Sequence, residues 1–164
     1  MEIIEVTAGQ WNEPTFDTAA EAIGYRSPRA ERAADDSLLM SGATIDSARY
    51  TDRELRLWLS KGRIFRIYLD GKRVEWELLV RNVATDQSWD EPAPCVLRFV
   101  NSQVGDSVWN RPSLLERRIG SALRGIWTGK QILFLYVAGT KSLMFGALER
   151  LPERTSLLHW DETH

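Results

Sequence analysis

A regular alternation of apolar and polar side chains between Leu55 and Val80 restricts this chain more than any other feature of its sequence. Apolar residues recur at every second position through three short runs, which is the spacing of strands with one buried face. Ser60-Lys61-Gly62 separates the first two runs and Asp70-Gly71 the next two. Glycine at these places suits hairpin turns that need a positive φ. The stretch therefore predicts a three-stranded antiparallel meander over residues 54–81.

Hairpins of these lengths also predict which residues stand opposite each other across the strands. The pairing forms two wholly apolar rows on one face of the sheet. A one-residue slip would send those side chains to opposite faces, so the agreement favours this register. The rows are Leu57–Phe65–Trp76 and Leu55–Ile67–Val74, and we expect Leu57, Phe65, Trp76, Ile67 and Val74 to be buried together.

The opposite face of this meander carries Arg56, Trp58, Arg66 and Tyr68, with Glu75 expected across from Arg66. Trp, Tyr and Arg are enriched at the centres of protein interfaces. We therefore predict that this face meets another protein or a second copy of the chain, provided that Trp58 is substantially exposed. In the alternative, a helix such as the Ala-rich N-terminal segment covers this face within the monomer.

A helix competes with the first strand of the meander. Thr51-Asp52-Arg53-Glu54 has the form of a capping box, and Leu55, Trp58 and Leu59 have helical spacing. Short segments often fit both periods. We favour the strand, and a helix from Thr51 to Leu59 would contradict the meander.

The chain after the meander predicts an α+β fold dominated by antiparallel sheet. A strand near 95–100 is apolar on both sides, which suits the interior of a sheet. A helix near 113–125 follows, and a second meander covers residues 131–160. The helix should pack on a sheet through a stripe of apolar residues at helical spacing. This stripe consists of Leu115, Ile119, Ala122, Leu123 and Ile126.

The first 50 residues predict short helices and irregular chain. Phe16–Ile23 forms one short helical pattern, and Ser27-Pro28 opens a second, Ala-rich one. Leu38-Leu39-Met40 then provides a compact apolar anchor. We expect one domain over residues 1–164, in which 1–50 is the helical or irregular segment and 54–161 holds the sheet and its helix.

Length and composition exclude several classes of protein. A chain of 164 residues is long enough for a substantial core. Its net charge of −2 does not favour nucleic acid or an anionic membrane as a partner. No run approaches the roughly 18 apolar residues that span a bilayer. With a single cysteine, Cys95, and no visible signal peptide, a cytoplasmic location is expected.

The residues that usually carry chemistry are scarce in this sequence. The two histidines are His159, in a predicted strand, and the terminal His164. One Cys and two His do not make a zinc site, and no nucleotide-binding glycine motif is present. The acidic pairs Asp90-Glu91 and Asp161-Glu162 are expected to be solvated. We therefore expect no cofactor, no metal and no catalytic residues.

Two classes of function are consistent with these observations. The first is a non-catalytic protein-binding module, a profile shared by antitoxin-type and immunity-type inhibitors. The second is a small-ligand or enzymatic domain with a pocket in a curved antiparallel sheet. Of the 21 basic residues 17 are Arg. Genome base composition explains this excess, and the alternative is that Arg forks recognise carboxylates or phosphates.

Overall fold

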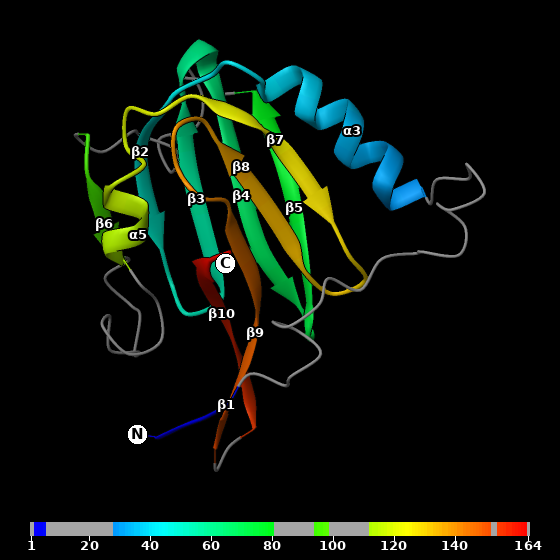
Figure 1. The fold of residues 1–164 in the computed structure, drawn as a ribbon. Helices are drawn as coiled ribbons and strands as arrows, with labels where there is room; N and C mark the ends of the chain where they lie inside the picture. The colour runs from blue at the N-terminus through cyan, green and yellow to red at the C-terminus, as the bar shows by residue number, and fades with distance from the viewer. Residues whose placement is uncertain (1, 6–27, 81–93, 99–111, 152–153, 164) are drawn as a thin grey trace.

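The computed structural model describes residues 2–5, 28–80, 94–98, 112–151 and 154–163, and these form two sheets with two helices (Figure 1). The first sheet is an antiparallel meander extended by one parallel strand. It comprises β2 (Ile45–Tyr50), β3 (Glu54–Leu59), β4 (Arg63–Asp70) and β5 (Arg73–Val80), with β6 (Val96–Arg98) parallel to β2. The second sheet comprises β7 (Leu123–Thr128), β8 (Leu133–Val137), β9 (Leu143–Leu151) and β10 (Thr155–Glu162), with β1 (Glu2–Glu5) on β9. The predicted α+β fold with two antiparallel meanders is confirmed.

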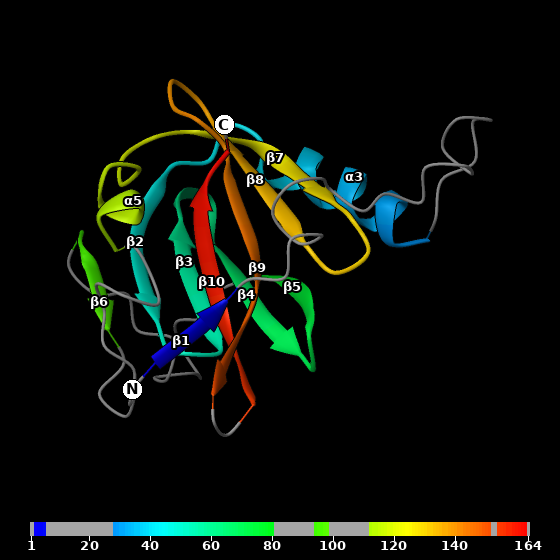
Figure 2. The ribbon, with the colours of Figure 1, turned by 60° about the horizontal axis from the view of Figure 1, so that its bottom comes forward.

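One hydrophobic core lies between the two sheets. It joins apolar residues of the first meander, such as Phe65 and Trp76, to residues of the second, such as Phe145 and Trp160. Figures 1 and 2 show the second sheet lying over the first, with α3 (Pro28–Met40) along one side and α5 (Pro112–Glu116) on the other. Both helices bury apolar residues in this core.

The first predicted hairpin is confirmed in its register. Leu57 stands opposite Phe65 and Leu55 opposite Ile67. Residues 60–62 form the turn, where Lys61 and Gly62 both have positive φ, of 68° and 69°. The helical alternative for Thr51–Leu59 is wrong, because Glu54–Leu59 is strand β3.

The second hairpin differs from its prediction by two residues. Asp70 pairs with Arg73, so Gly71-Lys72 forms the two-residue loop in place of Asp70-Gly71. Phe65 consequently faces Leu78, and Ile67 faces Trp76. A shift by two residues leaves every side chain on its predicted face. The predicted core is therefore confirmed: Leu57, Phe65, Trp76, Ile67 and Val74 are each at most 1% exposed and belong to one cluster.

The predicted helix over 113–125 is wrong beyond Glu116. The chain turns at Gly120, which has a φ of 86°, and Leu123–Thr128 is strand β7. A bulge between Leu123 and Gly125 shifts the register of β7 against β8. The extra residue places both Leu123 and Ile126 in the core although they are three positions apart. This spacing imitates one turn of a helix, which explains the incorrect prediction.

Two further strands differ from expectation. Ile45–Tyr50 is strand β2, whereas the sequence predicted irregular or helical chain there. A register shift between Ile45 and Ser47 breaks its alternation, so the period of two is not visible in the sequence. The strand predicted near 95–100 is present as β6. It lies at the end of the first sheet, parallel to β2, and not in the sheet interior.

Helix α3 closes the side of the molecule where β5 and β7 end their sheets. The Ser37 hydroxyl accepts a hydrogen bond from the Ile126 amide at 2.9 Å. The Arg32 guanidinium donates to the Trp76 carbonyl of β5 at 3.0 Å. A Cβ added at Gly125 would lie 2.8 Å from the Ser37 Cβ, so glycine allows this close approach. Side chains of α3 thus satisfy backbone groups on β5 and β7, each of which pairs with a single strand within the described residues.

The remaining N-terminal predictions are partly confirmed. The Ala-rich helix is present and extends to Met40, whereas the helical pattern at 16–23 lies outside the described residues. The anchor at 38–40 is only partly correct. Met40 is fully buried, but Leu38 and Leu39 are 80% and 60% exposed.

Candidate functional site

The four residues predicted as an interaction face come together on one side of β3 and β4. Arg56 stands opposite Arg66, and Trp58 and Tyr68 lie on the neighbouring rows. Trp58 is only 1% exposed, so the exposed indole that the interface hypothesis requires is absent. The expected cover, helix α3, lies instead against β5 and β7. The buried Trp58 therefore provides no anchor for a partner of the isolated chain.

The arginines of this face are engaged in ion pairs with acids of the same sheet. Arg66 contacts Glu54 through Nε at 3.1 Å and Glu77 through Nη1 at 3.4 Å. Arg56 also pairs with Glu54. Glu77 takes the place expected for Glu75 because of the two-residue shift in the hairpin. Burial alone would raise the pKa of Glu54, but hydrogen bonds from Arg66 and Arg56 outweigh it and lower that pKa.

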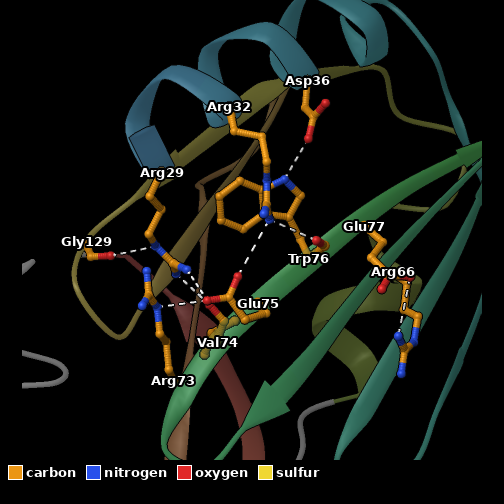
Figure 3. Close-up of polar contacts among 10 residues, drawn as sticks. All are labelled: Arg29, Arg32, Asp36, Arg66, Arg73, Val74, Glu75, Trp76, Glu77 and Gly129. Atoms are coloured by element: carbon orange, nitrogen blue, oxygen red, sulfur yellow. Dashed lines mark hydrogen bonds and ion pairs between the residues drawn. The ribbon is translucent and has the colours of Figure 1, made fainter. Parts of the chain in front are cut away.

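A second group of charges joins α3 to β5, and we call it the arginine cluster: Arg29, Arg32 and Arg73 around Glu75. Figure 3 shows the three guanidinium groups converging on this carboxylate, at 2.6 Å from Arg29, 3.6 Å from Arg32 and 2.8 Å from Arg73. Burial lowers the pKa of Arg29, and the attraction of Glu75 offsets only part of that decrease. The cluster therefore has more positive than negative charge around a single acid.

The buried indole of Trp76 lies within the same contacts. Its Nε1 donates to Asp36 at 2.8 Å, and the Arg32 guanidinium lies 3.8 Å from the centre of its ring (Figure 3). Arg29 also donates to the carbonyls of Val74 and Gly129. Every one of these contacts is internal to the chain. The arginine cluster therefore attaches α3 to the sheets, in keeping with the stacking and forked hydrogen bonding that arginine permits.

A surface concavity lies at the end of the second sheet, and we call it the hollow. It has a volume of about 470 Å³ and is open to solvent. Arg124 at the start of β7, Tyr136 and Val137 at the end of β8, and loop residues 139–142 line it. Arg124 and Lys141 are both exposed, and neither makes an ion pair with any described residue. The hollow thus holds two cations without an ion pair among the described residues, and Lys141 lies near enough to Glu162 for its charge to help lower the pKa of that carboxyl.

The other polar groups of the hollow are hydrogen-bond donors. Tyr136 is 39% exposed, and burial raises the pKa of its phenol, which stays protonated near neutral pH. Thr140 and Ser142 add hydroxyl groups from the loop, of which that of Thr140 donates to the Lys141 carbonyl at 3.3 Å. Two cations beside three hydroxyl groups form an environment suited to an oxyanion, meaning a carboxylate or a phosphate. Sequence patterns did not indicate this site, because Arg124, Tyr136 and Lys141 belong to no motif.

The loop that lines the hollow is fixed from inside the molecule by Arg118, which is 1% exposed. Its Nη2 donates to the Lys141 carbonyl at 2.6 Å and to Glu162 at 3.1 Å, and its Nη1 donates to the Leu114 carbonyl at 2.7 Å. The hydrogen bond from Arg118 lowers the pKa of Glu162 and outweighs the opposing effect of burial. One guanidinium therefore connects α5, the β8–β9 loop and the end of β10.

Comparisons with known proteins do not identify a function. Neither the family models, nor the curated proteins, nor the solved structures include a match to this chain. None of the described helices is long and apolar enough to cross a membrane. Among the same residues, no three His, Cys, Asp or Glu side chains gather in a way that could hold a metal ion.

Proposed function

We propose that the protein is a non-catalytic binding module and that the hollow captures an oxyanion presented by a partner protein. The exposed cations Arg124 and Lys141 line one concavity and make no ion pair among the described residues, and this is the observation that carries the proposal. Most cations on a protein surface gain little from exposed pairing. Two cations that line one concave surface together with hydroxyl groups, in contrast, provide a positive environment in which an anion can gain from both.

The shape of the hollow favours a group presented by a protein over a free small molecule. Small-ligand sites usually enclose most of their ligand in a concave cavity. This hollow is open, and a carboxylate side chain, a chain terminus or a phosphorylated residue can enter it while the rest of the partner stays outside. An inhibitor of the antitoxin or immunity type is one form that such a module takes. A free carboxylate or phosphate compound is the second candidate ligand, since its binding chemistry is the same.

Titration of the full chain with two probes tests the proposal. A hexaglutamate peptide represents a protein partner, and inorganic phosphate represents a free anion. NMR should show shifts in the amide signals of residues 139–142 with both probes, and tighter binding of the peptide. Tighter binding of phosphate would favour the small-ligand class.

Substitution of the two cations provides the control for this titration. In Arg124→Gln and Lys141→Gln each probe should bind about tenfold more weakly, because a hydrogen bond to a charged group contributes about 1.5–3 kcal/mol. Lys72→Gln removes an exposed cation from a turn of the other sheet and should leave binding unchanged. Equal binding by all three variants and the natural chain would contradict the proposed site.

A further inference from the structure

We propose that Arg118 is a positioning residue for the hollow, which holds the segments bearing Arg124 and Lys141 at the spacing that an oxyanion needs. This inference rests on the proposed function. The guanidinium of Arg118 is nearly inaccessible to solvent and donates to the loop that lines the hollow. Burying a charged group is unfavourable unless hydrogen-bond partners compensate for the lost water. The fold therefore depends on the specific contacts of Arg118, unlike those of an exposed arginine.

The contacts of Arg118 reach both cation-bearing segments. Through Nη2 it holds the carbonyl of Lys141 itself. The backbone at the same position is fixed as well, independently of the side chain: the Arg118 carbonyl accepts from the Ser121 amide at 3.0 Å, shortly before Arg124. Ser121 in turn accepts from the Ile45 amide, which ties this segment to β2. One residue therefore links the loop carrying Lys141 to the chain that leads into Arg124.

The C-terminal strand completes the support of the loop. Glu162 is the counter-ion of Arg118, and the Thr163 amide donates to the Ser142 carbonyl at 2.9 Å. Arg117 also pairs with Glu162, at 3.3 Å, but its side chain is 61% exposed and has no hydrogen bond to the loop among the described residues. Arg117 and Arg118 thus share one acid, and only Arg118 contacts the loop that lines the hollow.

This difference between neighbours gives a matched pair of variants, Arg118→Met and Arg117→Met, with Arg118→Lys as the conservative change. Binding of hexaglutamate should weaken about tenfold in Arg118→Met and change less than twofold in Arg117→Met. Arg118→Lys should lie between them, because an ammonium keeps the ion pair with Glu162 but lacks the fork that holds two carbonyls. All affinities are measured well below the unfolding midpoint of each variant, on chains shown by NMR to be folded.

Two measurements separate positioning from a purely structural role. The dependence of hexaglutamate affinity on salt should become shallower in Arg118→Met, since a displaced Lys141 no longer meets the anion. Amide hydrogen exchange of residues 139–142 should accelerate in Arg118→Met and stay unchanged in Arg117→Met. A role in stability alone would lower the melting temperature and leave affinity, salt dependence and loop exchange of the folded chain unaltered.

The outcomes distinguish this inference from the proposed function. If Arg118→Met binds hexaglutamate as the natural chain does, while Arg124→Gln with Lys141→Gln does not, the positioning role is overturned and the binding site stands. If the natural chain binds neither hexaglutamate nor phosphate, both are overturned. Should Arg118→Met fold too poorly to measure, Arg118→Lys provides the same test at smaller amplitude, because it keeps the charge beside Glu162 and removes only the fork that holds the loop.

Discussion

The arginine cluster and the hollow contain similar side chains in opposite situations. In the arginine cluster three guanidinium groups surround Glu75, and those of Arg29 and Arg32 also contact backbone carbonyls and the indole of Trp76. In the hollow, Arg124 and Lys141 make no ion pair with any described residue. Cations whose partners lie within the chain contribute to stability, whereas cations without a partner remain available to a ligand. Pairing, and not residue type, therefore separates the structural region from the candidate site.

Removal of Trp76 should have the largest effect on stability. Its side chain is 1% exposed and lies between α3 and the core, where Asp36 and Arg32 hold it. Trp76→Ala should lower the free energy of unfolding by about 3–5 kcal/mol, because the space cannot collapse easily. Urea denaturation followed by circular dichroism measures this change.

Trp127→Ala is the matched control for that variant. Trp127 is only half-buried and packs on Phe134 at the edge of a smaller apolar cluster. Trp127→Ala should lower the free energy of unfolding by clearly less than Trp76→Ala. Equal losses in the two variants would contradict the expected difference between a buried and a half-buried tryptophan.

A pair of arginine substitutions tests the comparison directly. The Arg29 side chain is 9% exposed and donates to Glu75 and two carbonyls, so Arg29→Met should lower the free energy of unfolding by about 1.5–3 kcal/mol. Arg124→Met should change it by less than about 0.5 kcal/mol. Binding of hexaglutamate should respond in the opposite order. A stability loss in Arg124→Met as large as in Arg29→Met would remove the distinction between the two regions.

The sequence predicted the buried face of the first meander far better than the candidate site. The alternation from Leu55 to Val80 identified the buried face correctly, and the two-residue error at Asp70-Gly71 did not alter it. Alternation records which side of a strand is buried, and it loses this information at a bulge. For that reason strand β2 was missed and β7 was mistaken for part of a helix.

The hollow depends on information that a sequence does not display. The chain has 17 arginines, and nothing in their local pattern separates Arg29, which is paired, from Arg124, which is not. The difference arises because Glu75 is brought to Arg29 across 46 positions of sequence by the packing of α3. The interaction face was predicted on composition alone. The four predicted residues do lie together on β3 and β4, but Trp58 is buried.

Disturbing the close contact of α3 with β7 should lower the free energy of unfolding by less than the loss of Trp76. An alanine Cβ at position 125 would meet the Ser37 side chain at 2.8 Å, so Gly125→Ala should destabilise by about 1–3 kcal/mol. Gly42→Ala is the control, since Gly42 has a φ of 82° but nothing within 4 Å of an added Cβ. It reports backbone strain without a steric contact. A melting temperature lowered equally in both would show that α3 does not depend on the missing side chain.

The smallest expected effect is a pH dependence that belongs to paired charges only. The folded-state pKa of Glu54 lies below the value of about 4.3 for a free glutamate, since Arg66 and Arg56 favour its ionised form. The ionised carboxylate thus stabilises the fold above about pH 4.3, and this contribution is lost as the pH falls through the lowered pKa. Solvent screens these partly exposed pairs, so the loss should be smaller than the preceding ones.

Glu54→Gln should therefore reduce stability at pH 7 and approach the natural chain as the pH falls toward 3. Arg124→Gln should run parallel to the natural chain over the same range, because Arg124 makes no ion pair with an acid among the described residues. Urea midpoints at half-unit pH intervals measure both curves. If Arg124→Gln converged with the natural chain at low pH, Arg124 would have an acidic partner. In that case the pH dependence of stability would contradict the distinction between paired and unpaired cations.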